Sequence, residues 1–202
     1  MLCLPVISSG EMSSELLELS ERWAEIKYGT AENERAQALE KLAAEAERLV
    51  IADPDRAEPL IWQAVIVSTL AGEKGGFGAL SLVKQAKKLL ERAEIIDPDA
   101  LDGSIYTSLG SLYYQVPGWP IGFGSNDKAR DYLLKALAVN PTGMDPNFFY
   151  GDFLFQSKQY PSAVEAFEKA LQATPRIHRP LADAGRMAEI ETALAKAREQ
   201  LK

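Results

Sequence analysis

Apolar residues recur at every third or fourth position through most of the chain, which is the spacing of amphipathic helices. Residues 32–52 show it clearly, with a stripe of Ala36, Leu39, Leu42, Ala43, Ala46 and Leu49. Residues 58–71 are apolar on nearly all sides, which is typical of a helix in the middle of a stack. Prolines, glycines and capping serines separate the helices. We expect them at 13–28, 32–52, 58–71, 80–96, 103–115, 126–139, 145–157, 160–173 and 181–201.

One spacing pattern, A-x3-L/F-x2-A-x4-P, occurs three times along the chain. The copies are Ala86, Leu90, Ala93 and Pro98; Ala129, Leu133, Ala136 and Pro141; and Ala163, Phe167, Ala170 and Pro175. Small residues seven positions apart leave room for a neighbouring helix, and the large residue between them fills the gap. The proline ends the helix, because it has no N–H group and disfavours helix in the residue before it.

A second motif precedes two of these copies: Tyr106, Leu109, Gly110 and Tyr113 in one, and Tyr150, Gly151 and Leu154 in the other. With both motifs the chain resembles the tetratricopeptide repeat (TPR) family, whose signature is W-x2-L-G-x2-Y…A-x3-F…P. The match is weaker in the first copy, where Ala64 stands at the glycine position. The resemblance implies an all-α solenoid of about nine antiparallel helices in a single domain, residues 13–202. Its parts would be a degenerate pair at 13–56, repeats at about 57–102, 103–143 and 144–177, and a capping helix at 180–202.

Two glycine-rich inserts with the same Gly-Phe-Gly core, residues 72–79 and 116–125, stand between the two helices of the first two repeats. Ordering each residue costs about 1–2 kcal/mol, whereas burying a large apolar side chain returns about 1.5–3 kcal/mol. We therefore expect the second loop to be held by burial of Trp119, Ile121 and Phe123. Since successive repeats place their loops side by side, Phe77, Trp119 and Phe123 are expected to cluster at one edge. The loops would form either a lip over a binding groove or a cover for the helix ends.

In TPR proteins the first helix of each pair lines a concave groove. Carried over to this chain, the groove positions are Ile61, Val65, Thr107, Ser111, Tyr114, Gln115, Phe148, Asp152 and Phe155. Apolar and hydroxyl groups with one carboxylate suit an apolar or amphipathic peptide or helix. Alternatively, Phe148 and Phe155 are core residues beneath the final helix. That helix would close the core with an exposed polar face, which carries Arg186, Glu189, Lys196, Arg198 and Glu199.

The formal charge of −7 and pI of about 4.9 argue against nucleic acid or an anionic membrane surface as a partner. Cys3 is the single cysteine and His178 the single histidine, so we predict no disulfide within the chain and no metal site. No catalytic constellation stands out, and no cofactor is expected. The composition and the resemblance together predict a non-catalytic scaffold that binds a protein or peptide. The alternative is a small-molecule-binding partner of a transporter or of an exported complex.

Residues 1–12 form a separate segment. Residues 2–7 are apolar and Ser8-Ser9-Gly10 are small, which resembles the last part of a secretory signal peptide. The chain also resembles exported bacterial TPR proteins of uncharacterised role. We therefore expect a periplasmic or exported protein. The alternative is a cytoplasmic protein in which this tail packs on the first helix pair.

Overall fold

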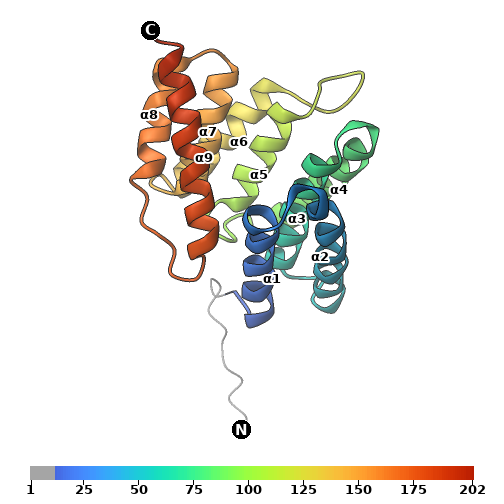
Figure 1. Cartoon of the computed structure of the whole chain (residues 1–202). Helices are drawn as coiled ribbons and strands as arrows, with labels where there is room; N and C mark the ends of the chain where they lie inside the picture. Colours follow the sequence, from blue (N-terminus) through green and yellow to red (C-terminus); the bar gives the residue numbers. More distant parts are fainter. Residues whose placement is uncertain (1–11) are drawn as a thin grey trace.

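The structure, a computed structural model, describes residues 12–202 apart from the side chain of Phe77. Within these residues the chain forms nine α-helices and no strand (Figure 1). A short π-helix, η1 (Glu25–Gly29), continues α1. The α-helices are Ser14–Ala24 (α1), Glu32–Ala52 (α2), Ala57–Lys74 (α3), Gly76–Ile96 (α4), Ser104–Gln115 (α5), Asn126–Val139 (α6), Met144–Gln156 (α7), Tyr160–Leu171 (α8) and Pro180–Glu199 (α9). The predicted all-α stack is confirmed.

The helix ends follow from local chemistry. Ser13 and Ser125 cap α1 and α6, because their hydroxyl oxygens accept from the N–H groups of Leu16 at 3.3 Å and Lys128 at 3.4 Å. Each of α2, α4 and α6 ends two residues before a proline. The proline lacks the donor that another helical turn would need.

Two of the antiparallel helix pairs, α5–α6 and α7–α8, meet at the glycine of the repeat motif. A Cβ atom on Gly110 of α5 would lie 2.6 Å from Leu133 Cγ on α6, and one on Gly151 of α7 would lie 2.7 Å from the ring of Phe167 on α8. Leu133 and Phe167 are fully buried. The glycine of the sequence motif therefore permits the close approach that the large residue of the partner helix fills.

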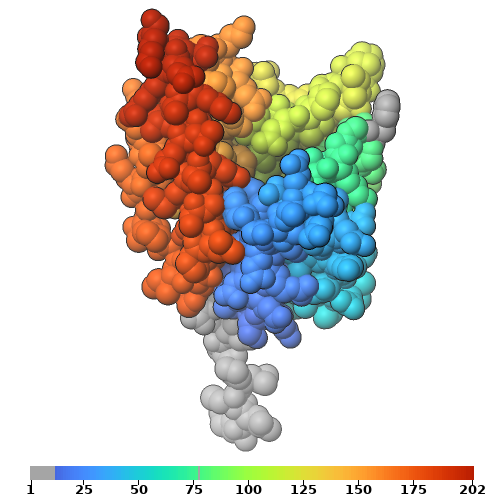
Figure 2. All heavy atoms as spheres, in the orientation of Figure 1, coloured from blue at the N-terminus to red at the C-terminus, as the bar shows by residue number. Residues whose placement is uncertain are grey.

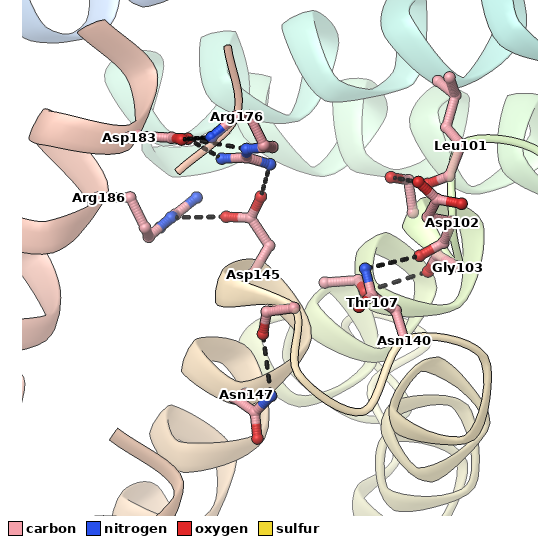
Figure 3. Close-up of polar contacts among 12 residues, drawn as sticks. Leu101, Asp102, Gly103, Thr107, Asn140, Asp145, Asn147, Arg176, Asp183 and Arg186 are labelled. Carbon is pink, nitrogen blue, oxygen red and sulfur yellow. Dashed lines mark hydrogen bonds and ion pairs between the residues drawn. The ribbon is translucent and has the colours of Figure 1, made fainter. Parts of the chain in front are cut away.

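Successive helix pairs are joined by hydrogen bonds of constant sequence separation. Four of them span 38 residues each, and they join Arg92 to Pro54, Tyr132 to Glu94, Asn140 to Asp102, and Tyr114 to Asp152. The bond from the Asn140 side chain to the Asp102 carbonyl is visible in Figure 3. This regularity indicates that the pairs stack with one repeated offset.

The prediction of a loop at residues 72–79 is wrong. Helix α3 continues to Lys74 and α4 begins at Gly76, so that Gly75 alone separates them. Gly75 has φ +59°, which glycine adopts without a side-chain clash. The inserted residues lengthen the hairpin to helices of 18 and 21 residues, against 13 and 12 in α7 and α8. A helical insert satisfies its own backbone hydrogen bonds, which a glycine-rich loop does not.

Candidate partner-binding groove

Helix α9 crosses the molecule from the last helix pair to the first (Figure 1). Its second half packs Ile190, Leu194 and Ala197 into the apolar cluster of α7 and α8. In its first half, Ala182 joins the N-terminal cluster that contains Trp23 and Trp62. A Cβ atom on Gly185 would lie 2.4 Å from the Tyr28 ring of η1. Helix α9 therefore covers part of the groove as well as closing the end of the stack.

A network of charged side chains fixes the first half of α9. Arg186 Nε donates to Asp145 Oδ1 of α7 at 2.8 Å, and Arg176 Nη1 donates to Asp145 Oδ2 at 2.7 Å (Figure 3). Arg176 also pairs with Asp183 of α9. The Arg186 guanidinium lies 4.5 Å from the centre of the Phe148 ring. The expectation that Arg186 is exposed is wrong: its side chain is 8% exposed, because it spans from α9 to α7.

The pKa shifts describe the same network. Burial alone would raise the pKa of Asp145, but the guanidinium groups of Arg186 and Arg176 outweigh it and hold the pKa well below its usual range. Burial and the nearby Arg186 lower the pKa of Lys27, although Glu189 opposes this with its carboxylate 3.0 Å from the Lys27 ammonium. Asp145 therefore stays negatively charged, and its carboxylate joins Arg176 of the linker and Arg186 of α9 to α7.

The predicted groove residues fall into two groups. Ile61 and Thr107 are buried in the structure, and Phe148 lies beneath Arg186. Phe155 packs against Tyr160 of α8, with ring centres 5.5 Å apart. The remaining positions are partly or fully open to solvent: Val65, Ser111, Tyr114, Gln115 and Asp152.

Three of the open positions, Tyr114, Gln115 and Asp152, meet near the C-terminal ends of α5 and α7. The Tyr114 hydroxyl donates to Asp152 Oδ2 at 2.6 Å, and the Gln156 amide donates to the same oxygen at 3.1 Å. The Gln115 amide donates to the Tyr114 hydroxyl at 3.2 Å. Burial and the Asp152 carboxylate raise the pKa of Tyr114 well above its ordinary value, so the phenol remains a donor at neutral pH. The result is a fixed polar floor with two exposed amides.

The loop at residues 116–125 is present as predicted, and its backbone is held tightly. Gly124 N–H donates to the Pro117 carbonyl at 3.0 Å, and Ser125 N–H donates to the Tyr113 carbonyl at 2.8 Å. A Cβ atom on Gly124 would lie 1.9 Å from the Val116 carbonyl oxygen, and one on Gly122 would lie 2.5 Å from that of Pro117. The two glycines of the motif are therefore needed for the two sides of the loop to meet.

The aromatic side chains of this loop point in different directions. Phe123 packs inward, with its ring centre 5.5 Å from that of Tyr113. Trp119 is 89% exposed and Ile121 is 64% exposed, so the expected burial of these two is wrong. Backbone hydrogen bonds and Phe123 suffice to order the loop. Trp119 and Phe123 do not cluster, and the side chain of Phe77 lies outside the described residues.

Figure 2 shows an open notch between the C-terminal helices α7 to α9 (orange and red) and the 116–125 loop (yellow-green). The sequence pattern did not indicate that α9 packs against both ends of the stack, because its charged residues suggested a solvated face. The small residues Ala182 and Gly185 are the feature of the sequence that could have predicted close packing of this helix against a neighbour. Among residues 12–202, no three His, Cys, Asp or Glu side chains form a candidate metal site, and no helix has the length and apolar character of a membrane span.

Comparison with known proteins supports the repeat assignment. A tetratricopeptide repeat family model matches residues 145–177. TTC0263, a thermophilic TPR protein of Thermus thermophilus, is 19% identical, with 89% of each chain covered and a TM-score of 0.60. MamA AMB-1 is 21% identical, with 93% of this chain and 98% of that chain covered and a TM-score of 0.50. No curated protein matches the chain. The fold is therefore that of a TPR solenoid.

Proposed function

We propose that this protein is a non-catalytic scaffold that binds a protein or peptide partner in the notch between the C-terminal helices α7 to α9 and the 116–125 loop. The observation that carries the proposal is the 89% exposure of Trp119 on a loop with a fixed backbone. A large apolar side chain held in water on a rigid support is a ready anchor, because binding buries it with little further loss of backbone entropy.

The polar floor supports the same proposal. The exposed amides of Gln115 and Gln156 can donate to and accept from the backbone of an extended segment. Asp152 is already held by Tyr114 and Gln156, which limits its movement when a partner arrives. Because α9 covers the side near Phe148, the partner would enter at the C-terminal ends of α5 and α7.

We expect Trp119→Ala to weaken binding of the native partner by about 2 kcal/mol or more, as truncation of an anchoring tryptophan does. The free energy of unfolding should change by less than about 0.5 kcal/mol, since the side chain is exposed in the free protein. The measurement is affinity capture from the native host, followed by titration of the captured partner, alongside chemical denaturation of both proteins.

Ile177→Ala is the matched control, because Ile177 is also 89% exposed and lies on the linker before α9. Gly124→Ala retains Trp119 but disrupts the loop, so it should also lose the partner. Equal capture by wild type and Trp119→Ala would overturn the proposal. Loss of capture by Ile177→Ala as well would point to general adhesion of apolar side chains. A small molecule that co-purifies with wild type would favour the alternative, a small-molecule-binding protein.

We also propose that the protein is exported, which rests on the apolar residues 2–7 and the small residues after them. These residues lie outside the described part of the chain. Sequencing the N-terminus of the native protein and fractionating the host cells test the proposal. Recovery of an intact Met1 in the cytoplasmic fraction would reject it.

A further inference from the structure

A second surface is formed by α4 and α6. We call it the α4–α6 face. Lys84, Lys88 and Arg92 are exposed on α4 at four-residue spacing, which places them on one side of the helix. A shallow hollow of about 470 Å³ runs along this side, and Leu89 supplies apolar surface to it. The three basic groups therefore border a depression that other atoms could fill.

A larger hollow, of about 680 Å³, lies between α4 and α6. Tyr113 and Tyr132 line it, with their rings stacked 5.6 Å apart, and Leu134 is 46% exposed at its edge. The Lys128 ammonium lies 5.4 Å from the centre of the Tyr113 ring, and the Lys135 ammonium lies 5.1 Å from that of Tyr132. This hollow combines an aromatic surface with two cations, and the carboxylates of Glu91 and Asp131 also line it.

Most of the lysines of this face have no ion-pair partner among the described residues. Lys84, Lys88, Lys128 and Lys135 form no ion pair with other residues of the described chain, whereas Lys87 pairs with Glu91. Contact with an aromatic ring leaves the positive charge in place. Burial and Glu94 raise the pKa of Tyr132 to about 12, so the phenol adds no negative charge at neutral pH.

This positive face contrasts with the rest of the protein. The net charge is −7, and residues 1–58 contain 13 acidic and six basic side chains. Residues 76–96 contain four basic and two acidic side chains. An acidic partner would be repelled by the N-terminal helices and attracted to α4 and α6. The charge distribution therefore favours a negatively charged partner and directs it to the α4–α6 face.

We propose that the α4–α6 face docks an acidic, amphipathic helical segment of a partner protein. Carboxylates four residues apart on one helix are about 6 Å apart, the same rise that separates Lys84, Lys88 and Arg92. An apolar side chain of the same segment would enter the hollow beside Tyr132 and Leu134. The inference does not depend on the partner in the notch.

The probe is a synthetic, fluorescein-labelled helical peptide with glutamates at every fourth position and leucines on the adjacent side. We expect it to bind wild type, and to bind the Lys84→Ser/Lys88→Ser double variant about tenfold more weakly or worse by fluorescence anisotropy. Raising the salt concentration to about 0.15 M should reduce wild-type binding and narrow the difference. A peptide of the same composition with glutamates distributed around the helix should bind more weakly.

Lys169→Ser/Lys196→Ser is the control, because it removes two exposed lysines elsewhere and changes the net charge equally. It should bind the peptide as wild type does, and so should Trp119→Ala, which separates this surface from the notch. Equal binding by both lysine double variants would overturn the proposal. The proposal would also be overturned if Lys84 and Lys88 were needed to bind a different ligand and not the peptide. The ligands to compare are phosphatidylserine vesicles, an oligonucleotide and a second copy of the chain, the last measured by sedimentation.

Discussion

Asp145→Ala is expected to lower the free energy of unfolding by about 3–5 kcal/mol, because the buried Arg186 guanidinium loses one of its two carboxylate partners and keeps only Glu189. Arg176 loses a partner at the same time, although Asp183 still accepts from it. Denaturation by urea, followed by circular dichroism, measures the change. The first half of α9 should also become less protected from amide hydrogen exchange, because these ion pairs join it to α7.

Glu168→Ala is the comparison, since it removes the exposed ion pair with Arg198 and should cost less than about 1 kcal/mol. If Asp145→Ala were no more destabilising than Glu168→Ala, the network would not hold α9 in the groove. Exchange protection that stayed at the wild-type level in α9 would lead to the same conclusion.

The same network predicts how stability depends on pH. The pKa of Asp145 is lower in the folded protein than in the unfolded chain, where it is about 3.9. Its contribution is therefore complete above about pH 5 and is lost as the pH falls through about 4 and below. In Asp145→Asn this group cannot ionise, so the variant should be less stable than wild type at pH 6, and the difference should shrink towards pH 3. A constant difference across this range would contradict the assignment.

Gly110→Ala is expected to destabilise the protein by about 1–3 kcal/mol, because the added methyl group overlaps a packed core. Its Cβ would lie 2.6 Å from Leu133 Cγ and 3.2 Å from the Leu133 backbone nitrogen. Since Leu133 is fully buried and the backbone contact cannot be relieved by rotating a side chain, α5 and α6 would have to separate. Thermal and chemical denaturation measure the loss.

Gly72→Ala provides the matched control for this prediction. Gly72 is also helical, but it is exposed, and a methyl group added there would have no atom within 4 Å. Alanine should therefore stabilise α3 by about 0.5–1 kcal/mol. If both substitutions changed stability in the same direction, helix propensity would decide the outcome at Gly110 and the close approach of α5 to α6 would not.

The sequence predicted most helix boundaries within one to three residues, since the local signals agree with the tertiary fold. Residues 32–52 and 126–139 are helical as predicted. Residues 72–79 are the exception, because their glycines, and their position as extra residues between the two helices of a repeat, suggested a loop. The turn of the long helical hairpin uses two consecutive glycines at positive φ, Gly75 and Gly76, and the sequence does not distinguish them from the other glycines of this segment.

The candidate site was predictable in part. The repeat register indicated which helices face the groove, and the Tyr114 and Asp152 positions do meet there. The position of α9 was not predictable, because the ion pairs of Arg186 and Arg176 with Asp145 join residues 41 and 31 positions apart. The exposure of Trp119 was missed because the hydrogen bonds that order its loop come from backbone groups.

The helices outside residues 72–79, their pairing and the motif glycines Gly110 and Gly151 follow from the sequence alone, because they depend on interactions between residues near in sequence or on a regular repeat. Three outcomes needed the folded chain: α9 returns to the first helix pair, Arg186 is buried and Trp119 is exposed. They depend on charge pairing and packing between distant segments, whose balance of desolvation and attraction is set by the surrounding structure.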